Sequence, residues 1–189
     1  MNDQRPVRAA PPALFLLVAL SALQPVALNI IAPSTPALAR EFHTDYGTVQ
    51  LTLTVYLVAV ALSQLVTGPW SDRAGRRPVV LFALITFFVG CLAAAIAPTI
   101  EALIAARVVQ AIGSGAAFAL ARSIIRDTSD RDEAASRIGY MMVAMLVAPM
   151  LSPTLGSVID RIAGWHAIFL AMAGIAACSW TLVWLRLPE

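Results

Sequence analysis

The 189-residue sequence contains no lysine, and only 13% of its residues are charged. A typical soluble domain has about 25% charged residues, and a nucleic-acid-binding domain is strongly basic. The hydrophobic share is 59%, and the mean hydropathy is +0.79. A water-soluble chain of this length cannot bury so much apolar surface. The composition therefore excludes a soluble globule, a disordered chain and a nucleic-acid partner, and it predicts a membrane protein whose partner is the lipid bilayer.

Residues that build metal and catalytic sites are scarce. The sequence has two cysteines and two histidines, and no His or Cys lies at metal-ligand spacing from either cysteine. We therefore expect no metal, no cofactor, no catalytic residues and no enzymatic activity.

Six apolar segments are long enough to cross a bilayer, which takes about 20 helical residues. They cover residues 13–32, 48–67, 79–97, 100–121, 136–158 and 166–185. The alternating runs of a membrane β-barrel do not occur. The sequence predicts an all-α bundle over residues 13–187, preceded by an N-terminal segment, 1–12.

The arginines predict the orientation of the bundle. If the six spans alternate, ten arginines fall on one side, Arg40 and Arg161 fall on the other, and Arg107 lies within a span. Because cytoplasmic loops are enriched in basic residues, we expect both termini to be cytoplasmic.

The chain also contains an internal repeat. The pattern G-x-x-x-D-R begins at Gly68 and recurs at Gly156, a shift of 88 residues that places span one on span four, two on five and three on six. Because three is an odd number of crossings, the two copies have opposite orientations. The sequence predicts a 3+3 inverted repeat, an arrangement found in secondary transporters.

The most specific stretch is residues 68–78, G-P-W-S-D-R-A-G-R-R-P. Gly68 permits close helix approach, and Gly75 permits a tight turn. An ordinary basic loop would explain the arginines but not the glycines and the aspartate at this spacing. The stretch resembles, letter for letter, the G-x-x-x-D-R-x-G-R-R signature between helices two and three of the major facilitator superfamily.

This resemblance implies the N-terminal half of a major-facilitator fold, with a central cytoplasmic linker beginning at 188–189. It also implies that the stretch forms a gating latch on the cytoplasmic side. In such a latch, Asp72 holds a helix of the second half, and Arg76 pairs with Asp127. The implied latch residues are Gly68, Asp72, Arg73, Gly75, Arg76, Arg77 and Asp127.

Arg107, Gln110 and Ser114 form a polar stripe on one face of span four. Burying a cation in a span is costly, so Arg107 should face a cavity or a partner. The stretch resembles the family's helix-four motif R-x-x-Q-G-x-G-A-A, in which the arginine is tied to proton coupling. The alternative is a structural arginine bonded to helix carbonyls.

Span five carries Pro149, Pro153 and Gly156, which resemble the family's antiporter motif G-P-x-x-x-G-G. The two prolines should bend the helix. With residues 24–33, these features resemble the bicyclomycin- and chloramphenicol-resistance branch of the drug/proton antiporters. Asn29 stands in the pathway where many relatives carry a protonatable Asp, so we expect no proton site at that position.

The sequence predicts an efflux transporter of drug-like amphipathic compounds in the bacterial inner membrane, working by alternating access and proton antiport. This chain would supply one half, and a second six-helix half would come from the same gene, a separate chain or a self-dimer. The alternatives are a half-transporter of another substrate class or a passive channel. An intramembrane serine protease is excluded because Ser114 lies about 20 Å below the outer edge, where His166 stands.

Overall fold

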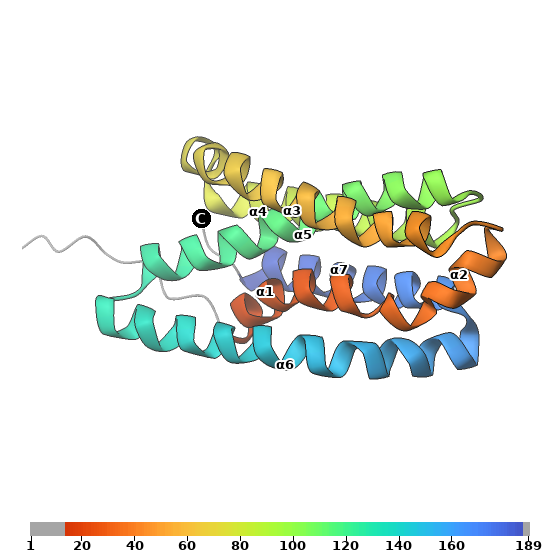
Figure 1. The fold of residues 1–189 in the computed structure, drawn as a ribbon. Helices are drawn as coiled ribbons and strands as arrows, with labels where there is room; N and C mark the ends of the chain where they lie inside the picture. Colours follow the sequence, from red (N-terminus) through yellow and green to blue (C-terminus); the bar gives the residue numbers. More distant parts are fainter. Residues whose placement is uncertain (1–13, 187–189) are drawn as a thin grey trace, which may run out of the picture.

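The computed structural model describes residues 14–186, which form seven α-helices and one 3-10 helix (Figure 1). In chain order they are α1 (Leu14–Asn29), η1 (Ala32–Ser34), α2 (Thr35–Glu41), α3 (Tyr46–Ala74), α4 (Arg76–Ala95), α5 (Ile100–Thr128), α6 (Arg131–Ala163) and α7 (Trp165–Arg186). The predicted N-terminal segment 1–12 and the linker start at 188–189 lie outside the described residues.

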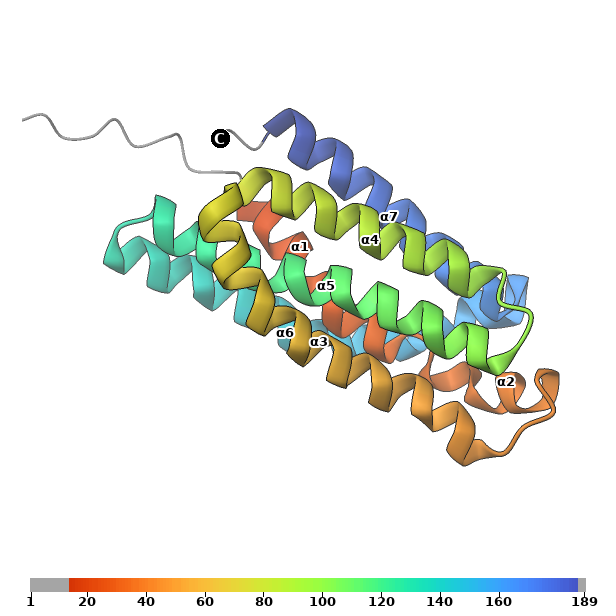
Figure 2. The same cartoon turned by 90° about the horizontal axis from the view of Figure 1, so that it is seen from above.

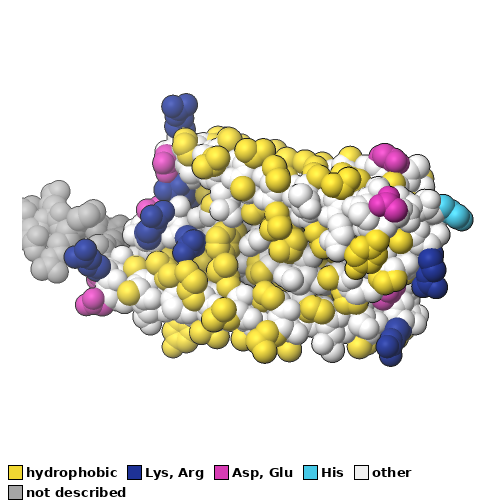
Figure 3. Space-filling view, in the orientation of Figure 1, with side chains coloured by type: hydrophobic (Ala, Val, Ile, Leu, Met, Phe, Trp, Pro, Cys, Tyr) yellow, Lys and Arg dark blue, Asp and Glu magenta, His cyan; other side chains and the backbone are white. Residues whose placement is uncertain are grey.

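Six helical segments are long and apolar enough to cross a membrane. One of them, Leu14–Glu41, consists of α1, η1 and α2 together. No strand occurs within residues 14–186, so the predicted all-α class with six crossings is confirmed. Charged side chains gather at the two ends of the bundle, with an apolar band between them (Figure 3). We call the end that holds the α3–α4 and α5–α6 connections the arginine-rich end.

The first crossing contains a break in the helix, whereas the sequence predicted one continuous span over residues 13–32. α1 ends at Asn29, and the chain passes through η1 before α2 begins at Thr35. Pro33 and Pro36 lack the N–H that a continuous helix needs, so this segment cannot extend α1. The side-chain amide of Asn29 donates to the Pro25 carbonyl at 2.7 Å and closes the last turn of α1.

A glycine with a positive φ joins the last two helices within each half of the repeat. Gly75 (φ +89°) separates α3 from α4, and Gly164 (φ +79°) separates α6 from α7. Non-glycine residues rarely adopt this conformation. The matching turns agree with the predicted inverted repeat, in which α3–α4 corresponds to α6–α7.

Hydropathy underestimated the helix lengths at the arginine-rich end. α3 continues to Ala74, so residues 68–74 of the signature lie on its last two turns rather than in a loop. These turns are too polar for a span but still form regular backbone hydrogen bonds, including Gly75 N–H to Ser71 O at 3.0 Å. Residues 68–74 of the signature are therefore helical, and Gly75 forms the turn that follows them.

At the opposite end of the bundle, Asp45 caps α3. Its carboxylate accepts the Thr48 N–H at 3.1 Å and the Thr48 hydroxyl at 2.5 Å, and these bonds hold the pKa of Asp45 below its ordinary value.

α5 is the central helix, and it packs against α1, α3 and α4 (Figure 2). A Cβ at Gly113 would lie 2.5 Å from the Ala83 carbonyl oxygen, so the small residue permits close packing of α4 on α5. α6, in contrast, buries only Met141, Ser152 and Gly156. Large apolar side chains on α3 and α6 remain exposed, including Leu65 and Leu146.

Candidate functional site

The signature residues meet around Arg76, the first residue of α4. Its Nη2 lies 2.7 Å from Asp72 Oδ1 on α3, and its Nε donates to Asp127 Oδ2 on α5 at 2.9 Å. Its Nη1 donates to the Ser71 hydroxyl. One guanidinium therefore joins three helices at the arginine-rich end, and the pairing of Arg76 with Asp127 agrees with the family resemblance.

This ion cluster is open to solvent. The side chains of Arg76, Asp72 and Asp127 are 28%, 61% and 50% exposed. Ion pairs of such exposure contribute only about 0–1 kcal/mol each. The cluster can therefore break and reform at little cost.

The other signature residues have separate environments. Arg77 Nη2 donates to the Trp184 carbonyl at 2.9 Å, and its guanidinium lies 5.5 Å from the Trp184 ring, which ties the start of α4 to α7. Arg73 is exposed. The expected close helix approach at Gly68 is wrong within the described chain: a Cβ there would meet nothing within 4 Å, because Gly68 borders a pocket between helices.

A second polar cluster surrounds Arg107 in the core. The side chain is only 1% exposed, and its Nη1 donates to the Ala27 carbonyl of α1 at 3.0 Å and to Gln110 Oε1. The guanidinium carbon lies 4.2 Å from the centre of the Tyr56 ring, a cation–π contact. Nε and Nη2 have no hydrogen-bond partner within residues 14–186, so the buried cation retains free donors.

The predicted stripe on α5 extends from Arg107 to neighbouring helices. Gln110 Nε2 donates to Cys91 Sγ on α4 at 3.0 Å. The Ser114 hydroxyl lies 2.7 Å from the Tyr56 hydroxyl, which also donates to the Gln24 carbonyl at 3.2 Å. The sequence pattern predicted only the members of this cluster that lie on α5. Tyr56 and Cys91 carried no signal, since their contacts join residues distant in sequence.

Asn29 lies two residues beyond the Ala27 carbonyl that Arg107 contacts. Within the part of the chain that the structure describes, no hydrogen bond joins Asn29 to Arg107; the Asn29 amide is bonded to Pro25.

The α6 motif marks the contact between α6 and the break after α1. A Cβ at Gly156 would collide with the Ile30 carbonyl oxygen, so only glycine allows this approach. α6 runs unbroken through Pro149 and Pro153 from Arg131 to Ala163 (Figure 1). The prolines therefore do not interrupt the helix.

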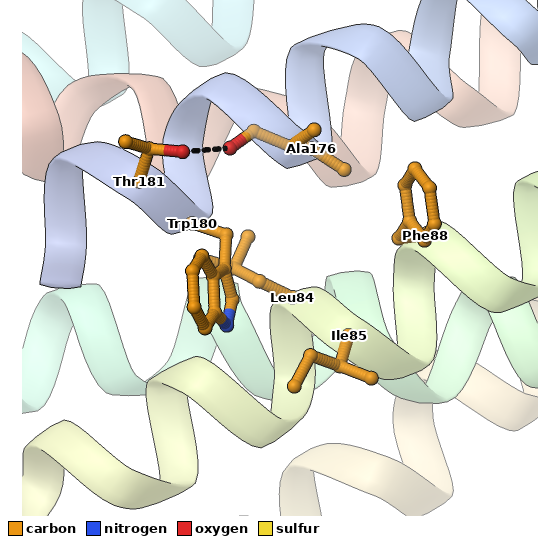
Figure 4. Close-up of a pocket in the computed structure, with 7 residues that line it drawn as sticks. Leu84, Ile85, Phe88, Ala176, Trp180 and Thr181 are labelled. Atoms are coloured by element: carbon orange, nitrogen blue, oxygen red, sulfur yellow. Dashed lines mark hydrogen bonds between the residues drawn. The ribbon is translucent and has the colours of Figure 1, made fainter.

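An apolar groove of about 220 Å³ lies between α4 and α7 (Figure 4). Its walls include Leu84, Phe88 and Trp180, and none of the predicted site residues lines it. No group of three or more His, Cys, Asp or Glu side chains within residues 14–186 is placed to hold a metal ion.

Comparison with known proteins identifies the same family as the signature of residues 68–78. The sequence profile of the Major Facilitator Superfamily matches residues 14–189. The chain is 36% identical to the uncharacterised MFS-type transporter YdgK of Bacillus subtilis (strain 168), over 93% of this chain and 44% of that protein. It is 34% identical to Multidrug resistance protein D of Escherichia coli (strain K12), over 87% of this chain and 42% of that protein.

A chloramphenicol resistance protein of Pseudomonas aeruginosa is 32% identical, over 87% of this chain and 41% of that protein. The crystal structure of a D-xylose–proton symporter superposes with a TM-score of 0.81 and 16% identity, over 93% of this chain and 48% of that chain, and it supports the fold alone. The chain thus spans less than half the length of these proteins. The matches confirm the resemblance predicted from the signature, and the chain belongs to the major facilitator superfamily of membrane transporters.

Proposed function

We propose that this chain is the N-terminal half of a transporter that exports drug-like amphipathic compounds by alternating access. The names of two relatives, a multidrug resistance protein and a chloramphenicol resistance protein, support the substrate class. The observation that carries the mechanism is the position of Arg76, which bonds to α3 and α5 at once through exposed ion pairs.

In this proposal the Arg76 cluster is the gating latch. With Asp72 and Asp127 it closes the arginine-rich end while the transporter is open to the outside, and it separates when that end opens. Switching transitions commonly use ion pairs that break and reform at an interface. Gly75 keeps Arg76 next to α3 during the exchange, and Arg73 contributes charge at the same end.

Transport is coupled to protons through the Arg107 cluster. A buried arginine with unpartnered Nε and Nη2 can exchange its hydrogen bonds when a nearby group gains or loses a proton. Asn29 cannot take that proton. The proton-binding carboxylate is therefore contributed by the second half, while Arg107, Gln110 and Ser114 relay the change to α1 and α3.

A second six-helix half completes the transporter. The exposed apolar side chains of α3 and α6 supply a surface for it, and this chain covers 48% of the symporter structure. The excess of arginine at one end supports an orientation with both termini in the cytoplasm, in the bacterial inner membrane.

The test is accumulation of chloramphenicol in drug-sensitive bacteria that express the chain with the second half of YdgK. We expect energised cells to accumulate less drug than cells with either half alone, and a protonophore to remove the difference. A passive channel, the alternative function, would equilibrate the drug with or without the protonophore. An unchanged difference after protonophore addition would overturn proton-driven export.

A further inference from the structure

A polar pocket of about 520 Å³ lies between α3, α5 and α6 near the arginine-rich end. Its lining includes Gln64 and Gly68 on α3, Phe118, Arg122 and Arg126 on α5, and Ile138 on α6. Figure 3 shows basic side chains at this end, where the surface is hollowed between α3 and α6. The volume falls within the range of about 300–1,000 Å³ typical of small-molecule sites.

The two arginines of this pocket have no acidic partner among the residues that the structure describes. Neither Arg122 nor Arg126 forms an ion pair within residues 14–186. The carboxylates of Asp72 and Asp127 are bonded to Arg76, and that of Glu133 is bonded to Arg137. Two like charges one helical turn apart repel each other, so an anion between them would be stabilised.

The lining changes from charged to apolar with depth. Arg126, Arg122 and Phe118 follow one another at four-residue intervals on one face of α5. At 1.5 Å per residue, they lie about 3, 9 and 15 Å from the end of that helix. Arg122 lies over the Phe118 ring at 5.4 Å, so one aromatic face and one guanidinium meet inside the pocket. Such an order suits a molecule with an anionic end and an aromatic body.

We propose that this Arg122–Arg126 pocket binds the carboxylate of amphipathic aromatic acids. Both guanidinium groups donate charge-assisted hydrogen bonds to the carboxylate, which suits the planar donor fork of arginine, and the aromatic body packs against Phe118. The inference rests on the proposed function in one respect: it makes aromatic acids a substrate class of the exporter. Binding itself requires no transport.

The test uses the whole chain in phosphatidylcholine nanodiscs and calorimetric titration with salicylate. Salicylamide, which lacks the charge, is the matched probe. We expect salicylate to bind and salicylamide not to bind. The double variant Arg122→Gln/Arg126→Gln should weaken binding by at least about tenfold, because it removes charge-assisted hydrogen bonds. Arg161→Gln, at the opposite end of the bundle, is the control and should bind as the unmodified chain does.

A steric variant checks the location. Gly68→Leu should fill the pocket without changing charge, since a Cβ at Gly68 meets nothing within 4 Å. Equal binding of salicylate and salicylamide, or full salicylate binding by Gly68→Leu or by the double arginine variant, would overturn the proposal. Loss of salicylate binding when phosphatidylglycerol replaces half of the lipid would assign the pocket to a lipid headgroup and also overturn it. Failure of chloramphenicol export alone would contradict the proposed function and leave salicylate binding standing.

Discussion

Arg76 Nε lies 2.9 Å from the carboxylate of Asp127, although 51 positions separate the two residues in the sequence. The contact joins the start of α4 to the end of α5, and the same guanidinium bonds to Asp72 on α3. Three helices that end at the same side of the bundle therefore share one cation. A change at any of these residues alters how that end closes.

The first prediction concerns the acids of this cluster. Asp72→Asn and Asp127→Asn should each lower chloramphenicol export while the amount of protein in the membrane stays constant. Exposed ion pairs stabilise a fold by less than about 1 kcal/mol, so folding should be unaffected. Export rates normalised to membrane-inserted protein measure the effect, and Asp132→Asn, also exposed at the arginine-rich end, is the control.

Exchange of charge provides a stricter check on the latch. Arg76→Asp alone should stop export, and Arg76→Asp combined with Asp127→Arg should restore part of it. Full export by Asp127→Asn, together with no rescue by the exchange, would show that the cluster has no role in gating.

The second prediction separates the charge of Arg107 from its shape. Arg107→Lys keeps the cation but loses the planar group that lies over Tyr56 and bonds to Ala27. We expect proton-driven export to fall at least about tenfold, because an ammonium cannot reproduce the planar group that bonds to Ala27 and Gln110 while lying over Tyr56. The measurement is the initial export rate at equal membrane expression. Unchanged export by both Arg107→Lys and Arg107→Ala would make Arg107 purely structural.

The third prediction concerns Tyr56. Tyr56→Phe removes the hydroxyl that contacts Ser114 and the Gln24 carbonyl but keeps the ring against Arg107. It should lower the free energy of unfolding by about 1 kcal/mol and leave most export intact. Tyr56→Leu also removes the cation–π contact and should reduce export as strongly as Arg107→Lys does. Thermal unfolding in detergent and export assays measure the two effects; equal export by both variants would contradict a role for the ring.

The fourth prediction concerns the close approach of α6 to the chain after α1. Gly156→Ala places a methyl group against the Ile30 backbone and should destabilise the bundle by about 1–3 kcal/mol. Gly139→Ala, in the same helix, meets no atom within 4 Å and should be neutral or stabilise the helix. The two melting temperatures in detergent test this contrast. A Gly156→Ala protein that melts no lower than Gly139→Ala would contradict the packing described above.

Much of the fold follows from hydropathy and spacing. Six crossings, the all-α class and the turn at Gly75 are visible in the sequence, because bilayer thickness and backbone conformation restrict local composition. The break after Asn29 depends on Pro33 and Pro36. Hydropathy alone does not reveal it, because the apolar run continues past Asn29 to residue 32. The extension of α3 to Ala74 was missed because polar turns outside the bilayer have no hydropathy signal.

The candidate site was predictable only where a motif carried it. The signature pointed to Arg76 and Asp127, and periodicity placed Arg107, Gln110 and Ser114 on one face. Periodicity along one helix cannot show what lies across from it, so the contacts of Tyr56 and Cys91 were found only in the folded chain. Gly68 was likewise predicted to permit close approach of another helix. The position of the neighbouring helices cannot be seen in the sequence, and in the structure Gly68 borders a pocket.

Proton-driven export is tested most directly by chloramphenicol movement in liposomes that contain this chain and a second six-helix half. A pH gradient is imposed with no other energy source, and the drug is present at equal concentration on both sides. We expect the drug to move to one side until nigericin collapses the gradient, and we expect Arg107→Lys to slow this movement at least about tenfold. Drug that stays at equal concentration despite the gradient, with both halves inserted, would contradict proton-driven export.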